Sequence, residues 1–259
     1  MTLFQSLILG LVEGATEFLP VSSTGHLILA ASLLGVSVSD FTKVFEIAIQ
    51  LGAIAAVVVL YFKTFFDWQL LFKLAAAFIP TGLIGLFVYP FFKSVLEGNE
   101  VVTLLALFFG GLLLIWFEKV LGRAEDAAPE VAPRDLSWTQ AILVGFAQAV
   151  AIIPGVSRSG ATIVGGLALG ISRATIVEFS FLLAVPTMVA ATGLSLYKDH
   201  AFAYTMHEWL ALAVGTLAAF AVALAIVRWF LAYIRSHSFT AFGVYRVILS
   251  LVFLAWLFA

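Results

Sequence analysis

The sequence contains no cysteine and few charged residues. Without cysteine, disulfide bonds, iron–sulfur clusters and thiol catalysis are excluded. Charged residues make up only 11% of the 259 positions, whereas hydrophobic residues make up 63% and the mean hydropathy is +1.13. A soluble domain of this length carries far more charge, so we predict an all-α polytopic membrane protein. A Walker-type phosphate loop, an H-E-x-x-H motif and a Cys/His zinc set are also missing from the sequence.

What the sequence does contain is a series of long apolar runs. Six are long enough to cross the hydrocarbon core of ~30 Å, and they lie at about 44–62, 70–92, 101–118, 175–196, 209–229 and 240–258. Two further regions, 3–35 and 139–171, are interrupted at Pro20 and Pro154, so their halves are too short to cross alone. We predict a re-entrant helical hairpin for each, because broken backbone at membrane depth is tolerated only inside protein or beside a wet cavity.

The two interrupted regions are also copies of each other. Residues 5–28 align with residues 140–163 when Ser22 is placed on Ser157. The identical pairs are then Gln5 and Gln140, Gly10 and Gly145, Val21 and Val156, Ser22 and Ser157, Gly25 and Gly160, and Ile28 and Ile163. Three spans follow each hairpin, so the second unit enters the membrane from the opposite side, as in the inverted-topology repeats of transporters. We expect units at 1–118 and 138–259, joined by an exposed cytoplasmic linker at 119–137.

Basic residues in the loops predict the orientation. One side of the predicted topology holds most of them, namely Lys63, Lys119, Arg123, Arg134, Arg173, Arg228 and Arg235. The positive-inside rule makes this side cytoplasmic. The first hairpin then opens outward, the second opens toward the cytoplasm, and their tips meet near the middle of the membrane. We interpret Arg228, Arg235 and Arg246 as interfacial anchors that snorkel to the membrane surface.

Two carboxylates lie on one face of the first half-helix. Glu13 and Glu17 are four residues apart, and an ionised carboxylate inside a bilayer costs at least ~2.5–3.5 kcal/mol, so such residues are seldom without a function. The alternative is that this half-helix lies at the outer surface, where both side chains are wet. The aligned residues of the second copy are Gln148 and Ile152, so the scaffold itself does not require acids there.

The interruption of the first copy is rich in hydroxyl groups and is followed by a histidine. Ser22, Ser23 and Thr24 precede Gly25 and His26. Helix capping explains one hydroxyl. It does not explain His26, which is three residues after Ser23 and so can lie beside it on a helix. An imidazole near a hydroxyl can activate a nucleophile or protonate a leaving oxygen.

The second copy carries an arginine where the first has Ser23. Arg158 keeps its charge at any physiological pH, and its planar guanidinium binds phosphate through two hydrogen bonds. The N–H groups of a helix from residue 160 add a site for an anion. The alternative is a static buried ion pair between Arg158 and Glu13 or Glu17, which would add little stability. Because the two interruptions face each other in an inverted repeat, we expect an anion site equipped for phosphoryl transfer.

The two motifs also carry a family resemblance. The segments E-G-A-T-E-F-L-P-V-S-S-T-G-H (13–26) and P-G-V-S-R-S-G-A-T (154–162) resemble the signature motifs of bacterial undecaprenyl-diphosphate phosphatases, the BacA/UppP family. The resemblance implies a bacterial inner-membrane enzyme that removes the terminal phosphate of a C55 isoprenoid diphosphate. The outward opening of the first hairpin predicts that its active site opens to the periplasm. It also implies a role in peptidoglycan synthesis and bacitracin resistance.

The resemblance further implies the roles of individual residues. The catalytic core would be Glu13, Glu17, Ser23, His26 and Arg158, and the phosphate-binding residues would be Ser22, Thr24, Gly25, Ser157, Ser159, Gly160 and Thr162. A divalent cation, Mg²⁺ or Ca²⁺, would bind Glu13 and Glu17. Either Ser23 or water could be the attacking group, and the reaction could proceed with or without a metal ion. The sequence is also compatible with a monomer or a homodimer. A transporter or flippase of a polyprenyl phosphate lipid is the alternative function, because inverted repeats are transporter architecture.

Overall fold

The computed structural model describes residues 1–88, 99–125, 129–198 and 204–258, and all regular structure in these ranges is helical. The α-helices are α1 (Leu3–Thr16), α2 (Ser23–Leu33), α3 (Asp40–Leu60), α4 (Trp68–Phe87), α6 (Glu100–Glu125), α7 (Trp138–Ala149), α8 (Arg158–Ala168), α9 (Arg173–Lys198), α10 (Met206–Tyr233) and α11 (Thr240–Leu257). Three short 3₁₀ helices are η1 (Phe62–Phe66), η2 (Pro133–Asp135) and η3 (Val150–Ile152). The predicted all-α class is therefore confirmed.

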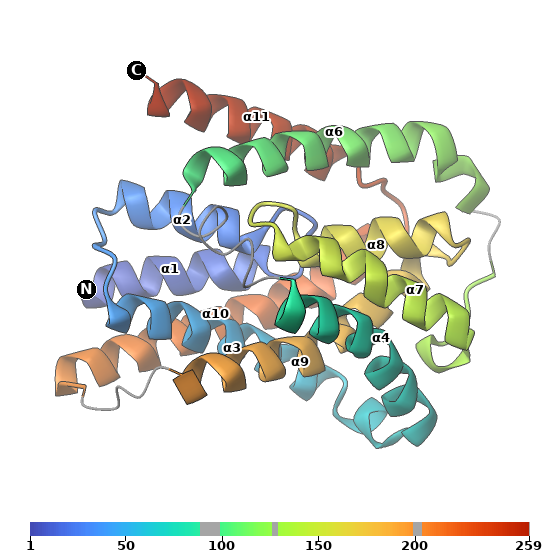
Figure 1. Ribbon diagram of the computed structural model, residues 1–259, viewed down its shortest axis with the longest axis horizontal. Helices are drawn as coiled ribbons and strands as arrows, with labels where there is room; N and C mark the ends of the chain where they lie inside the picture. Colours follow the sequence, from blue (N-terminus) through green and yellow to red (C-terminus); the bar gives the residue numbers. More distant parts are fainter. Residues whose placement is uncertain (89–98, 126–128, 199–203, 259) are drawn as a thin grey trace.

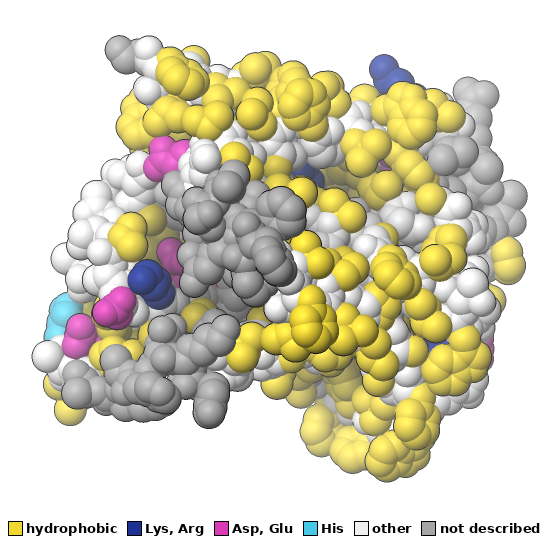
Figure 2. Space-filling model, in the orientation of Figure 1, with side chains coloured by type: hydrophobic (Ala, Val, Ile, Leu, Met, Phe, Trp, Pro, Cys, Tyr) yellow, Lys and Arg dark blue, Asp and Glu magenta, His cyan; other side chains and the backbone are white. Residues whose placement is uncertain are grey.

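Six of the helices, α3, α4, α6, α9, α10 and α11, are long and apolar enough to cross a membrane, as predicted. They run roughly along one common direction, with α11 beside α6 and α10 between α1 and α3 (Figure 1). Figure 2 shows hydrophobic side chains over much of one face, while acidic side chains gather toward the left of the view. An exterior of this kind is suited to contact with lipid chains.

The short helices form two pairs, α1 with α2 and α7 with α8. Each pair is tied to a long helix by a close glycine contact. A Cβ atom on Gly10 of α1 would collide with the backbone of Gly215 in α10, and one on Gly145 of α7 would collide with the backbone of Ala77 in α4. Small residues of this kind allow helix backbones to approach closely inside membranes. The two pairs are therefore held against the spans in the same way.

The two copies also share hydrogen bonds. A glutamine in the first turn of each pair reaches the end of the second helix: Gln5 Nε2 donates to Leu34 O at 3.0 Å, and Gln140 Nε2 donates to Leu169 O at 3.5 Å. Both glutamines also take part in a capping box at the start of their helix. The aligned glutamines in the sequence thus mark equivalent structural positions.

The segment between the two halves differs from the exposed linker predicted at 119–137. Helix α6 continues to Glu125, so the first part of that range is helical. Residues 126–128 lie outside the described part of the chain. The last part is held against α4, because the Lys73 ammonium group donates to the backbone carbonyls of Arg134 and Leu136. Leu136 itself is buried. Within the described part of the range, the start is therefore helical and the end packs against α4.

Candidate active site

The two interruptions between paired helices have the same backbone conformation. Ser22 has φ 70° and ψ 93°, and Ser157 has φ 77° and ψ 116°. Each serine caps the helix that follows: Ser22 Oγ accepts from the Gly25 N–H at 3.4 Å, and Ser157 Oγ accepts from the Gly160 N–H at 3.1 Å. Positive φ is uncommon outside glycine and persists where surrounding contacts impose it, often at functional sites.

These caps place the helix starts earlier than the sequence predicts. We expected helices from 26 and 160, whereas α2 begins at Ser23 and α8 begins at Arg158. Ser23 and Arg158 are therefore the first residues of the two helices. Their side chains project from equivalent positions, one in each copy.

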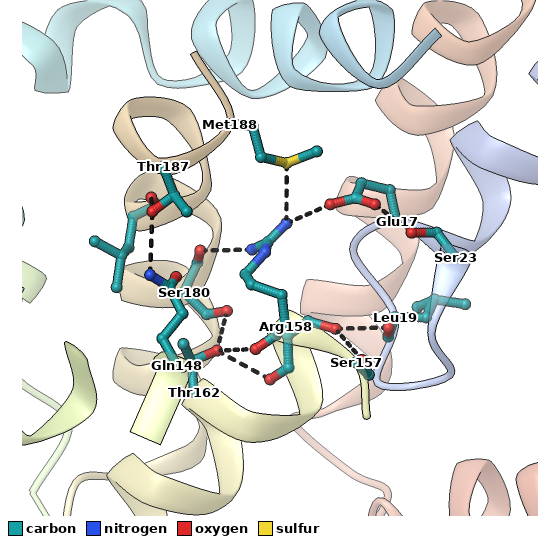
Figure 3. A network of polar contacts seen from close by, with 12 residues as sticks. Glu17, Leu19, Ser23, Gln148, Ser157, Arg158, Thr162, Ser180, Thr187 and Met188 are labelled. Carbon is teal, nitrogen blue, oxygen red and sulfur yellow. Dashed lines mark hydrogen bonds and ion pairs between the residues drawn. The ribbon is translucent and has the colours of Figure 1, made fainter. Parts of the chain in front are cut away.

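One carboxylate joins the two copies. Arg158 Nη2 lies 2.7 Å from Glu17 Oε1, and Ser23 Oγ donates a short hydrogen bond to Glu17 Oε2. Figure 3 shows Arg158 reaching from the second copy to Glu17 and Ser23 of the first. The structure therefore brings together three of the five predicted catalytic residues.

The guanidinium of Arg158 has further contacts that fix its plane. Its Nη1 donates to the Ser180 carbonyl at 3.0 Å, and its Nη2 lies 3.8 Å from Met188 Sδ. The ring of Phe18 lies 5.7 Å from the guanidinium carbon. The buried Nε–H has no hydrogen-bond partner within the described residues. Arg158 thus keeps donor capacity for an anion although it already pairs with Glu17.

A cavity of about 170 Å³ opens beside this network. Its polar lining consists of Glu17, Ser22, Ser23, Thr24 and Gln50 from the first half of the chain and Ser157 and Arg158 from the second. At ~30 Å³ per water molecule, this volume would hold about five waters. Hydroxyl groups and a guanidinium around a small cavity are suited to a phosphate group. The Arg158–Glu17 pair is therefore part of a cavity wall, unlike an ion pair enclosed in a core.

The remaining predicted phosphate-binding residues do not line this cavity. Thr162 is fully buried and its Oγ1 lies 2.6 Å from Ser180 Oγ. Ser159 Oγ donates to the Leu19 carbonyl at 2.6 Å and so ties α8 to the first interruption. Gly25 and Gly160 contribute the N–H groups of the two caps. These four residues fix the backbone around the cavity.

His26 has other partners than the predicted Ser23. Its Nδ1 lies 2.8 Å from the Ser22 carbonyl, and its Nε2 lies 2.7 Å from the Tyr245 hydroxyl. Because a carbonyl oxygen only accepts, Nδ1 carries the proton, and neutral Nε2 accepts from Tyr245. The side chain therefore supports the backbone of the first interruption.

Glu13 is fully buried, and neither of its carboxylate oxygens has a hydrogen-bond partner within the described residues. The aligned Gln148 instead donates to Thr81 Oγ1 at 2.9 Å and to Thr187 Oγ1 at 3.1 Å. The described residues contain no group of three or more His, Cys, Asp or Glu side chains that could hold a metal. Two carboxylates, Glu13 and Glu17, match the one or two that Mg²⁺ usually takes from a protein when a phosphate supplies further ligands.

Arg246 has a role that the sequence does not predict. We predicted an interfacial anchor, but this side chain is 1% exposed, so that prediction was wrong. Its Nη1 donates to Pro20 O at 3.2 Å in the first interruption, and its Nη2 donates to Gly155 O at 2.9 Å in the second. A Cβ atom on Gly110 would collide with the guanidinium. Gly110 thus leaves room for an arginine that holds the two interruptions together.

Comparison with known proteins identifies relatives of the whole chain. The family model described as bacitracin resistance protein BacA matches residues 6–252. A protein of Aquifex aeolicus named undecaprenyl-diphosphatase is 46% identical over 257 residues, which cover 99% of each chain. A protein of the same name from Sulfurihydrogenibium sp. is 47% identical over 256 residues, 99% of this chain and 100% of the relative. One from Wolinella succinogenes is 46% identical over 258 residues, 99% of each.

Proposed function

We propose that Glu17, Ser23 and Arg158 catalyse the reaction of this chain. The chain belongs to the bacitracin resistance protein BacA family and is an undecaprenyl-diphosphatase. The enzyme converts undecaprenyl diphosphate into undecaprenyl phosphate and inorganic phosphate. This reaction recycles the lipid carrier of peptidoglycan synthesis. The observation that supports the assignment most strongly is the network in which Glu17 joins Ser23 to Arg158 beside a cavity.

Arg158 would bind the phosphates together with the hydroxyl groups of Ser22 and Ser157. Its guanidinium is held by Glu17 and the Ser180 carbonyl, so it presents a fixed positive charge to the cavity. The positive ends of α2 and α8 point toward the same region and favour an anion. Charge that develops on the transferred phosphoryl group is stabilised by donors that are already in place.

Ser23 would act as the nucleophile and Glu17 as its base. Ser23 Oγ attacks the terminal phosphorus while its proton passes to Glu17 Oε2, with which it already shares a hydrogen bond. The bond between this phosphorus and the bridging oxygen breaks, and undecaprenyl phosphate leaves. Water then attacks the phosphoserine, the proton returns to Ser23 Oγ, and inorganic phosphate departs. Direct attack by water activated by Glu17 is the alternative.

His26 would act as a positioning residue. Its hydrogen bond to the Ser22 carbonyl supports the strained backbone that aims Ser23 at the cavity. This role replaces the direct contact with Ser23 that the sequence predicts.

Glu13 and Glu17 would hold a divalent cation together with the oxygens of the substrate diphosphate. The supporting observation is the unpartnered, buried carboxylate of Glu13. A bound Mg²⁺ or Ca²⁺ would neutralise phosphate charge. A phosphate-release assay with and without a chelator tests this part of the proposal.

The membrane arrangement that we propose is an inverted repeat of 1–118 and 138–259. The paired helices α1–α2 and α7–α8 would be re-entrant hairpins, supported by their matching caps and glutamine bonds. The polar cavity would open to the periplasmic side of the inner membrane, a proposal that the distribution of basic residues in the loops supports. Tagging the termini and the loop at 234–239 with a reporter that works only in the cytoplasm would test this orientation.

The test of the reaction uses purified protein in detergent and undecaprenyl diphosphate labelled in its terminal phosphate. We expect phosphate release and, after an acid quench during turnover, labelled phosphoserine at Ser23. Ser23→Ala should abolish both. Full turnover by Ser23→Ala would contradict the serine step and favour direct attack by water. A transporter or flippase would release no phosphate, so the same assay excludes or supports that alternative.

A further inference from the structure

A second cavity lies against the first interruption and is almost entirely apolar. Its volume is about 690 Å³, within the range of ~300–1,000 Å³ typical of ligand pockets. Leu19 and Val21 of the interruption form one side, Trp229 and Tyr233 of α10 form another, and Ala241 and Tyr245 of α11 complete it.

The segment that includes the first interruption contributes residues to both the apolar cavity and the polar one. Glu17 and Ser22 line the polar cavity, whereas Thr16, Leu19 and Val21 line the apolar cavity. Residues of one short segment thus alternate between the two. The two cavities share this segment as a wall.

Two hydrogen bonds connect the cavities beside that wall. The Tyr245 hydroxyl donates to His26 Nε2 at 2.7 Å, and His26 Nδ1–H donates to the carbonyl of Ser22 at 2.8 Å. The rings of His26 and Tyr245 are stacked, with centroids 5.5 Å apart. Tyr245 therefore presents its ring to the apolar cavity and its hydroxyl to a residue that supports the phosphate site.

We propose that the apolar cavity binds the first isoprene units of the substrate's prenyl chain, with Tyr245 at the end nearest the diphosphate. This inference rests on the proposed function. The chain and the diphosphate are parts of one molecule, so a site for the chain must begin beside the phosphate cavity. Bulk lipid is as apolar as this cavity, so moving the prenyl chain from lipid into the cavity gains little hydrophobic free energy. The cavity instead contributes by its shape and by its position beside the phosphate site. Holding the chain fixes the phosphorus relative to Ser23.

The test places a bulky side chain in the cavity and, as a matched control, on the outer surface of the same helix. Ala241 and Ala255 are both exposed residues of α11, but only Ala241 lines the cavity. Phenylalanine at either position displaces no buried neighbour. Ala15→Phe fills the same cavity from α1 and serves as a second variant. Each protein is assayed for hydrolysis of undecaprenyl diphosphate and for competitive inhibition by inorganic diphosphate, which has the phosphates without the chain.

We expect Ala241→Phe and Ala15→Phe to raise KM for undecaprenyl diphosphate about fivefold, with the inhibition constant of inorganic diphosphate unchanged. Ala255→Phe should behave like the wild type. The proposal would be overturned by an unchanged KM in both cavity variants. That result would indicate that ordinary lipid fills the cavity. An equal rise for Ala255→Phe, or a parallel rise in the inhibition constant, would also overturn it. Absence of phosphate release by the wild type would instead refute the proposed function.

Discussion

The interruption before α2 and the interruption before α8 share a backbone but differ in their side chains. Both contain a serine at positive φ, with φ 70° in one and 77° in the other, whose hydroxyl caps the next helix. At the first residue of that helix, however, one copy has Ser23 and the other Arg158. A backbone conformation that is used twice thus presents a hydroxyl group from one copy and a guanidinium group from the other.

Among the positions that differ, Glu17, Ser23 and Arg158 meet at the cavity, whereas Glu13 and His26 do not line it. Glu17 aligns with Ile152, and His26 aligns with Ala161. Glu17 binds Arg158 and Ser23 at once, so the acid of one copy connects the cation of the other to the hydroxyl beside it. The shared positions, such as the glutamines that bind the helix ends, hold each pair together. Substitutions that make one copy resemble the other should therefore separate catalysis from folding.

The largest effect is expected when the second copy receives the residue of the first. Arg158→Ser removes the charge that stabilises the transferred phosphoryl group, and we expect kcat/KM to fall about 10³-fold. The matched control is Arg173→Ser, which breaks the Arg173–Glu118 ion pair, also 2.7 Å long and buried, away from the cavity. The control should lose thermal stability and keep its activity per folded molecule. An active Arg158→Ser enzyme would contradict the proposed division between the copies.

The contact between the copies can be broken at Arg246. Arg246→Met leaves the carbonyls of Pro20 and Gly155 without their donor, so the two halves of the cavity lose their fixed separation. We expect kcat to fall about 10²-fold, with a smaller change in KM. Arg246→Lys should recover part of the loss, because an ammonium group can still bind some of the carbonyls. Equal kcat values for the wild type and Arg246→Met, measured on folded protein, would show that this contact does not position the site.

Glu13→Gln gives the first copy the residue that the second copy has at the aligned position, Gln148. The uncharged amide removes a buried carboxylate that has no partner among the described residues, so the midpoint of thermal unfolding should rise. Activity should fall about thirtyfold if the carboxylate orients Glu17 or a cation. The reciprocal variant, Gln148→Glu, should lower the unfolding midpoint through its contacts with Thr81 and Thr187. Loss of stability without loss of activity in Glu13→Gln would assign it a structural role.

The smallest effect is expected for His26→Ala, which again copies the second half. The Ser22 carbonyl loses its side-chain donor and keeps only the backbone N–H of residue 26, and we expect activity to fall about tenfold. Tyr245→Phe, which keeps the bond between His26 and Ser22, should reduce activity less. If His26→Ala were as inactive as Arg158→Ser, His26 would have a direct part in proton transfer.

The sequence predicts much of this comparison because the copies align without gaps through both interruptions. The spans, the paired short helices and the meeting of the two interruptions all follow from hydropathy and from the aligned positions. The partners of His26 and Arg246 do not. Spacing along a helix places His26 near Ser23, but Tyr245, 219 positions away, takes its Nε2. Hydropathy predicts that Arg246 lies near the end of a span and reaches the membrane surface. In the structure its guanidinium instead occupies the space beside Gly110, where a side chain would collide with it.

Glu17→Gln and Gln5→Ala provide the most direct test, measured as phosphate release per folded molecule together with the unfolding midpoint. Glu17 is a position at which the copies differ, and Gln5 is one at which they agree. We predict that Glu17→Gln loses at least about 10²-fold in turnover per folded molecule, a loss that any change in its unfolding midpoint does not explain. Gln5→Ala should lose stability and keep its turnover. Full activity in Glu17→Gln, or an inactive but stable Gln5→Ala protein, would contradict the account.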